Sequence, residues 1–143
     1  MSTRVLIVDD DAAIGQLIST ILTAEGYQAD TTTTYPEALS LMQQHDYGVI
    51  FSDIRLGQSH GGLDILKTAT TLAPFCKVIM MTGYPDVTTA IKAVRNGAFD
   101  YLCKPFDSLQ ISSITRHAAE NRRLQLEQER LREIGRASCR ERV

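Results

Sequence analysis

Five polar residues of this sequence have side chains that together could transfer a phosphoryl group. They are three carboxylates, one hydroxyl and one ammonium: Asp9, Asp10, Asp53, Thr82 and Lys104. Neighbouring carboxylates need a cation, because each negative charge raises the cost of ionising the next one. Hard oxygen ligands without a histidine or a thiolate favour Mg²⁺. A metal beside a carboxylate nucleophile and a lysine suits phosphoryl transfer, whose catalysis is mostly positioning and charge neutralisation.

A recurring strand and helix pattern places these residues at the ends of strands. Residues 4–8 read RVLIV, a β-branched run typical of a strand that is buried on both faces. Residues 12–26 carry apolar side chains at helical spacing and end on Gly26, a natural helix C-cap. The pattern recurs four times and predicts strands at 27–34, 47–53, 76–83 and 98–105 and helices at 36–44, 62–73, 86–97 and 107–134.

This alternation predicts an α/β protein with one doubly wound, five-stranded parallel sheet and five helices, the last of them extended. In such sheets the ligand lies beyond the carboxyl ends of the strands, where the strand order reverses. The predicted strands end in the site residues, the first at Asp9 and Asp10, the third at Asp53, the fourth at Thr82 and the fifth near Lys104. We therefore expect these side chains to converge at one edge of the sheet.

Each of these residues, taken alone, also has a purely structural explanation. An aspartate after a strand is often the N-cap of the following helix, and we assign that role to Asp11. Lys104 alone would be an ordinary surface lysine, and Thr82 a strand residue bonded to its neighbours. It is the joint placement at four strand ends that favours the chemical interpretation.

Four segments, VLIVDDD, IFSDIR, IMMTG and AFDYLCKPF, resemble the receiver domains of bacterial response regulators, the CheY-like superfamily. The resemblance spans about residues 4–118 and is greatest to receivers of NtrC-type regulators and related multidomain signalling proteins. It implies a flavodoxin-like fold with strand order 2-1-3-4-5. It also implies a module that accepts a phosphoryl group from a histidine kinase or a phosphotransfer protein.

The resemblance implies a role for each residue at the expected site. Asp53 corresponds to the phosphoacceptor, Asp10 to the principal Mg²⁺ ligand, and Asp9 to its partner, which acts directly or through water. The backbone carbonyl of Arg55 should complete the protein ligands of the metal. Lys104 corresponds to the lysine that pairs with the phosphoryl oxygens.

Two further positions correspond to a conformational switch. The Thr82 hydroxyl should bond a phosphoryl oxygen, and Tyr101 should turn inward as Thr82 moves toward the phosphate. This movement should change the surface formed by the fourth helix, the fifth strand and the fifth helix, and so control an output domain or a partner.

The sequence departs from the family in one loop. After Asp53 the family commonly has a turn of the Met-Pro-Gly type, whereas this chain reads RLGQSHGGLD, without proline and one residue longer. Arg55 and Tyr84 occupy positions that tune the access of hydrolytic water in the family. Two other positions follow the family: Pro105, which is usually preceded by a cis peptide bond, and Gly83, which leaves room for the phosphoryl group.

Two alternative functions would use the same residues. A phosphatase that forms an aspartyl-phosphate usually carries a second aspartate two residues after the nucleophile, and that position is Arg55 here. A receiver-like interaction domain that works without phosphorylation would not need the complete set of acceptor residues. No G-x-x-x-x-G-K phosphate loop is visible. We therefore expect a switch that takes phosphate from a partner, and not a turnover enzyme.

Composition separates an acidic body from a basic tail. Residues 1–115 contain 12 acidic and 7 basic residues, and residues 116–143 contain 5 acidic and 8 basic ones. The tail lacks a recognition motif and interleaved aromatics, so we do not expect it to bind nucleic acid by itself. The 3 cysteines have no metal-ligand spacing, and no run of about 18 apolar residues could span a membrane. These features favour a soluble, cytoplasmic protein.

We expect three parts in the chain: a receiver domain at 1–118, a helical linker at 119–133 and a non-native tail at 134–143. The linker has no core to rest on and is either a solvated single helix or a weak coiled coil that forms a homodimer, with a seam through Asn121, Leu124 and Leu131. The ending EIGRASCRERV resembles the translation of a sequencing adapter, in which case an output domain is missing. The alternative is a disordered, arginine-rich terminus.

Overall fold

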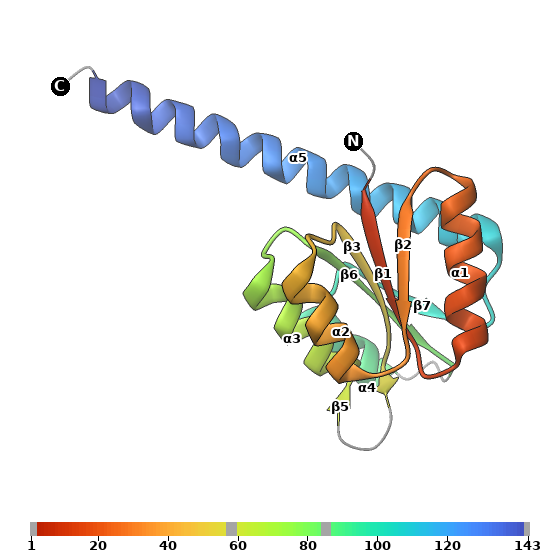
Figure 1. The fold of residues 1–143 in the computed structure, drawn as a ribbon. Coiled ribbons are helices and arrows are strands. Elements are labelled where there is room, and N and C mark those ends of the chain that lie inside the picture. The colour runs from red at the N-terminus through yellow and green to blue at the C-terminus, as the bar shows by residue number, and fades with distance from the viewer. Residues whose placement is uncertain (1–2, 57–59, 84–86, 142–143) are drawn as a thin grey trace.

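The computed structural model describes residues 3–56, 60–83 and 87–141 of the chain. Strands and helices alternate as the sequence predicts, with one additional pair of two-residue strands (Figure 1). In chain order the elements are β1 (Arg4–Val8), α1 (Ala12–Ala24), β2 (Gln28–Thr32), α2 (Tyr35–Gln44), β3 (Val49–Asp53), β4 (Arg55–Leu56), β5 (His60–Gly61), α3 (Gly62–Leu72), β6 (Lys77–Thr82), α4 (Val87–Arg95), β7 (Asp100–Cys103) and α5 (Ser108–Glu141).

The main sheet is parallel and has the order β2-β1-β3-β6-β7. Counting only its own strands, this is the order 2-1-3-4-5, so the predicted doubly wound α/β fold is confirmed. Helices α1 and α5 cover one face of the sheet, and α2, α3 and α4 cover the other (Figure 1). The strand order reverses between β1 and β3, so the ligand-binding edge is expected at the carboxyl ends of these strands.

The core consists of two hydrophobic layers, one on each face of the sheet. Successive strand residues point to opposite faces. In β1, Val5 and Ile7 pack on the side of α1 and α5, whereas Leu6 and Val8 pack on the side of α2, α3 and α4. All residues of β3 are buried, as expected for a central parallel strand. The carboxyl ends of the central strands are therefore held from both faces.

Local signals at three points of the chain agree with the sequence analysis. Asp11 is the N-cap of α1, and its side chain accepts a hydrogen bond from the Ala13 amide, as predicted. Gly26 follows the end of α1 with a φ of 96°, a conformation that favours glycine. The peptide bond between Lys104 and Pro105 is cis, as the resemblance implies.

Two features differ from the expectation. The loop after Asp53 contains a short antiparallel ladder between β4 and β5, which the sequence pattern could not reveal because two-residue strands have no readable periodicity. Helix α5 continues to Glu141 instead of ending at Ile134. No proline follows Pro105, and Gly135, the single glycine in this helix, costs only about 1 kcal/mol in a helix interior.

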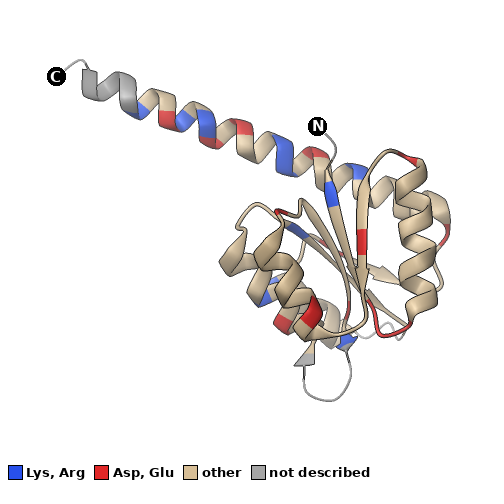
Figure 2. Ribbon diagram, in the orientation of Figure 1, with Lys and Arg blue, Asp and Glu red and all other residues tan. Residues whose placement is uncertain are grey.

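Helix α5 projects well beyond the body of the domain (Figure 1). Its outer part carries charges of both signs along the helix (Figure 2), including the pairs Arg123–Glu120 and Arg130–Glu127, each at 2.6 Å. Such pairs between exposed side chains stabilise a solvated helix only weakly. Among the described residues, no helix is both long and apolar enough to cross a membrane.

Candidate functional site at the carboxyl edge of the sheet

The carboxyl ends of four neighbouring strands bring the predicted site residues together. Asp9 follows β1, Asp53 ends β3, Thr82 ends β6 and Lys104 follows β7. In the register of the sheet, Thr82 lies opposite Cys103, which directly precedes Lys104. The expected convergence at one edge therefore follows from strand order and register.

Three carboxylates gather at this edge. Oxygen atoms of Asp9, Asp10 and Asp53 all lie within 4.8 Å of one another. Asp9 and Asp53 are buried, with 1% and 9% of their surface exposed, whereas Asp10 is exposed. Carboxylates this close together can share one cation, and a set of hard oxygens suits Mg²⁺ or Ca²⁺. The residues present therefore fit a divalent metal ion.

Backbone amides orient two of these carboxylates. The Asp11 N–H donates to Asp9 Oδ1 over 2.8 Å, and the Arg55 N–H donates to Asp53 Oδ1 over 3.1 Å. Each hydrogen bond fixes the direction in which its carboxylate points. Arg55, whose carbonyl the sequence analysis predicts as a metal ligand, thus lies directly beside Asp53.

Lys104 bridges the two buried carboxylates. Its Nζ donates to Asp9 Oδ2 over 2.8 Å and to Asp53 Oδ2 over 3.0 Å. Burial opposes the charged form of Lys104, but the hydrogen bonds to Asp9 and Asp53 outweigh burial and raise the pKa of the ammonium. Burial raises the pKa of Asp9, against the lowering effect of its hydrogen bond from Lys104. One ammonium cannot neutralise three carboxylates, so the site keeps an excess of negative charge that a cation would offset.

Thr82 and Tyr101, the two predicted switch residues, lie on adjacent strands. Thr82 is buried at the end of β6, with 8% of its surface exposed. Tyr101 on β7 packs against the core layer of α2, α3 and α4, and its hydroxyl is buried without a hydrogen-bond partner among the described residues. The ring of Tyr101 therefore already lies inward in this structure.

Two other predicted positions directly follow Thr82 in the chain. A Cβ atom at Gly83 would meet no heavy atom of the described chain within 4 Å, so the space beside this residue is open. Tyr84 lies outside the described residues.

The sequence analysis missed a close backbone contact behind Asp53. A Cβ atom at Gly62 would lie 2.4 Å from the backbone oxygen of Asp53, and one at Gly61 would lie 2.9 Å from the backbone oxygen of Ile54. The signal that could have revealed this contact is the Gly-Gly pair, because glycine often marks a place where two backbones approach each other.

Comparison with known proteins gives one consistent result. The family model of the response regulator receiver domain matches residues 5–116. The alginate biosynthesis transcriptional regulatory protein AlgB of Pseudomonas aeruginosa is 36% identical over 121 residues, which make up 85% of this chain and 27% of AlgB. The chain thus spans about a quarter of that relative's length.

Solved structures share the fold. NtrX from Brucella abortus, in complex with ADP, has a TM-score of 0.86 and 31% sequence identity, covering 92% of this chain and 30% of NtrX. A response regulator protein from Burkholderia pseudomallei, with a phosphorylated aspartic acid, a calcium ion and citrate, has a TM-score of 0.75 and 27% identity. That match covers 92% of this chain and 75% of the other.

Proposed function

Because the chain belongs to the response regulator receiver domain family, we propose that it is a phosphoacceptor module of a two-component phosphorelay. A histidine kinase or a phosphotransfer protein supplies the phosphoryl group in the cytoplasm, and Asp53 accepts it in a Mg²⁺-dependent reaction. The observation that supports this most is the Lys104 ammonium, which lies within hydrogen-bond distance of both Asp53 and Asp9 beside the exposed Asp10.

The proposed reaction is a displacement at phosphorus. A carboxylate oxygen of Asp53 attacks the phosphorus atom, and the bond from phosphorus to the donor histidine nitrogen breaks as the new bond forms. Mg²⁺, held by the three carboxylates and the backbone carbonyl of Arg55, would supply positive charge beside the transferring oxygens. Lys104 stays protonated at neutral pH, because its hydrogen bonds to the carboxylates raise its pKa, and it pairs with a phosphoryl oxygen.

The relative from Burkholderia pseudomallei supports both halves of this proposal. Its structure contains a phosphorylated aspartic acid together with a calcium ion. The acidic cluster of this chain offers the same kinds of group, a buried aspartate at a strand end and neighbouring carboxylates for a divalent cation.

We propose that Thr82 and Tyr101 convert phosphorylation into a change of surface. A ligand shifts an equilibrium between two states only if it interacts differently with each of them. A hydrogen bond from the Thr82 hydroxyl to the phosphoryl group would supply that difference and move the Tyr101 ring. The surface of α4, β7 and α5 would report the change, and it presents exposed apolar side chains: Val87, Ile91, Val94 and Leu109.

The partners proposed for this module are a phosphodonor and an output domain connected through α5. A second copy of the chain would pair weakly through Leu124 and Leu131 of α5, which are 52% and 55% exposed. Direct binding of nucleic acid is not part of the proposal. Turnover of external substrates is not part of it either, because Arg55 stands where a phosphatase would carry its general acid.

Intact-mass measurement tests this function. With Mg²⁺ and acetyl phosphate as a small phosphodonor, the protein should gain the mass of one phosphoryl group. Asp53→Asn should remove the gain, because an amide is a poor nucleophile, whereas the control Asp100→Asn, at an exposed position of β7, should not. Undiminished labelling of Asp53→Asn would place the acceptor elsewhere. A wild-type chain that neither acetyl phosphate nor a histidine kinase labels would favour a phosphorylation-independent interaction domain.

A further inference from the structure

The middle of α5, residues 119–126, contacts the amino edge of the sheet, opposite the acidic cluster, before the helix projects away from the domain (Figure 1). Buried residues of the first half, Ile111, Ile114 and Ala118, follow helical spacing. The stripe continues with Arg122 and Gln125, which are half-buried. Polar side chains thus take over where the apolar core ends, and they give this part of the linker a contact with the domain.

Arg122 makes the first contact with the amino edge. Its Nη2 donates to Asp46 Oδ2 over 3.0 Å, in the loop before β3. Gly48 in the same loop provides the space, because a Cβ atom there would lie 3.2 Å from Arg122 Cδ and 2.6 Å from Thr3 Cγ2. The missing side chain at Gly48 lets the aliphatic part of Arg122 lie against the edge of the sheet.

Gln125 makes the second contact, one turn farther along α5. The Lys77 Nζ donates to Gln125 Oε1 over 2.5 Å, and Lys77 is the first residue of β6. The same ammonium lies 6.0 Å from the centroid of the Phe99 ring. Burial lowers the pKa of Lys77. The helix therefore contacts the amino ends of the two strands whose carboxyl ends carry Asp53 and Thr82.

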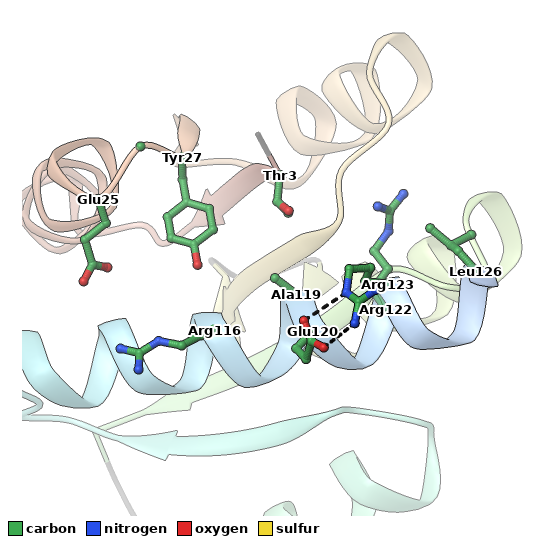
Figure 3. Close-up of a pocket in the computed structure, with 10 residues that line it drawn as sticks. Thr3, Glu25, Tyr27, Arg116, Ala119, Glu120, Arg122, Arg123 and Leu126 are labelled. Atoms are coloured by element: carbon green, nitrogen blue, oxygen red, sulfur yellow. Dashed lines mark hydrogen bonds and ion pairs between the residues drawn. The ribbon is translucent and has the colours of Figure 1, made fainter. Parts of the chain in front are cut away.

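The side of residues 119–126 that faces the turn between α1 and β2 is not packed against the domain. A cavity of about 490 Å³ separates it from the turn between α1 and β2 (Figure 3). Tyr27 lies on one side of this cavity, and Ala119 and Arg123 of α5 lie on the other. Arg122 and Gln125 thus provide the main polar contacts between this segment and the domain.

The polar contact is weak. Asp46 is 76% exposed, so its ion pair with Arg122 contributes little to stability. The pair is made by one guanidinium nitrogen, Nη2, so it is not the bidentate arrangement that makes such pairs strong. A segment with so few favourable contacts can open locally while the rest of the domain stays folded.

We infer that residues 119–126 of α5 dock reversibly on the amino edge of the sheet through Arg122 and Gln125. The docked segment fixes the direction in which the outer helix leaves the domain. The partner of the surface formed by Asp46, Gly48 and Lys77 is the chain's own helix. This inference does not depend on phosphorylation of Asp53.

Hydrogen exchange of the full chain, followed by mass spectrometry, tests the dock. In the wild type, residues 119–126 should exchange more slowly than residues 127–133, because an undocked helix end frays. Arg122→Ala should accelerate exchange in 119–126 by about threefold, as expected for the loss of a weak contact, and leave 108–118 unchanged. Gly48→Ala should act in the same direction without changing any charge, since its Cβ would press on the Arg122 stem at 3.2 Å from Cδ; combining it with Thr3→Ser removes the closer clash with Thr3 Cγ2 at 2.6 Å.

Arg123→Ala is the matched control. Arg123 is the adjacent arginine, and its side chain pairs with Glu120 on the same helix. This substitution should change exchange in 119–126 by less than about twofold. Equal acceleration by Arg122→Ala and Arg123→Ala would overturn the inference, because loss of one positive charge from the helix, and not loss of the dock, would then explain both. Protection of 119–126 that appears only at high protein concentration would also overturn it, since pairing with a second copy would then be the cause.

Discussion

At the residue scale, Lys104 is the positive charge that partly balances the three carboxylates of the acidic cluster. Its ammonium is shared between Asp9 and Asp53, so a phosphoryl group on Asp53 would redistribute these contacts. Asp9 is almost completely buried and depends on this partner, because an unpaired buried charge is strongly destabilising. Asp10 differs from both, since it is exposed. It can therefore be replaced with little cost to the fold.

Asp10→Ala should weaken Mg²⁺ binding and phosphorylation together. The lost carboxylate offsets part of the cation's charge, and we expect Mg²⁺ affinity to fall by about tenfold or more. Asp11→Ala is the matched control, because Asp11 caps α1 by accepting a hydrogen bond from Ala13. It should cost about 1 kcal/mol of stability and leave the affinity nearly unchanged. Titration calorimetry measures both variants, and normal Mg²⁺ affinity in Asp10→Ala would disprove its role as a ligand.

The positions of the carboxylates could be predicted from the sequence, but their pairing could not. A buried apolar run followed by an aspartate identifies the end of a parallel strand, as at Asp9 and Asp53. Which carboxylate oxygens Lys104 binds depends on the side-chain rotamers and on how far each strand extends toward the carboxyl edge of the sheet. Neither property has a periodic signal in the sequence.

At the scale of elements, the first residues of α3 lie directly against the backbone at the end of β3. The Gly62 amide donates to the backbone oxygen of Ile54 over 2.8 Å. The Gly61 amide donates to Asp64 Oδ2 over 2.9 Å, which holds the first turn of α3. This close approach supports the backbone of Asp53 from behind, and it requires residues without a Cβ atom.

Gly62→Ala should displace the backbone of Asp53 and slow its phosphorylation. The new Cβ would lie 2.4 Å from the Asp53 backbone oxygen and 2.5 Å from Met80 Cε. We expect a loss of about 1–3 kcal/mol in urea unfolding, as for other overpacked sites, and slower labelling by acetyl phosphate. Adding Met80→Leu removes the side-chain clash only and should not restore labelling. Full restoration would show that core packing, and not the Asp53 backbone, causes the defect. Gly15→Ala, whose Cβ would meet ordinary contacts at 3.6 Å, is the control.

A polar contact between β1, β2 and the start of β3 should make stability depend on pH. Asp30 accepts hydrogen bonds from Tyr47 Oη over 2.7 Å and from Arg4 Nε over 3.0 Å. Burial opposes ionisation of Asp30, but the bonds from Tyr47 and Arg4 outweigh it and lower the pKa of the carboxyl. A carboxyl whose pKa is lowered by folding stabilises the protein above its unfolded pKa of about 4, and that contribution is lost as the pH falls through the folded value.

Tyr47→Phe should therefore destabilise the protein more at neutral pH than in acid. We expect a cost of about 1 kcal/mol at pH 7, which shrinks once the pH falls below about 4 and Asp30 becomes protonated. Chemical unfolding at a series of pH values measures this difference. If Tyr47→Phe lowers the free energy of unfolding by the same amount at every pH at which the protein is folded, Tyr47 and Asp30 are not coupled.

At the scale of the whole molecule, the alternation of strands and helices predicted a doubly wound parallel sheet, because parallel strands require crossover connections. The strand order 2-1-3-4-5 came from the resemblance to receiver domains. The path of α5 could not be predicted in the same way. Its apolar stripe ends at Ala118, and the support beyond it comes from Arg122 and Gln125, which read as solvated residues in the sequence. Their partners, Asp46 and Lys77, are distant in the sequence, and the folding of the sheet brings them next to the helix.

The domain thus has one edge with the acidic cluster and an opposite edge that holds the outgoing helix.

The central claim is that Asp53 is the phosphoacceptor while Asp9 and Asp10 hold the metal. The most direct measurement is to find the phosphoryl group in the chain. After reaction with acetyl phosphate and Mg²⁺, borohydride reduction converts an aspartyl-phosphate to homoserine, and tandem mass spectrometry of peptides locates that residue. We expect homoserine at position 53 and none there after Mg²⁺ is removed with a chelator. Homoserine at position 9 or 10, or equal conversion without Mg²⁺, would contradict this assignment.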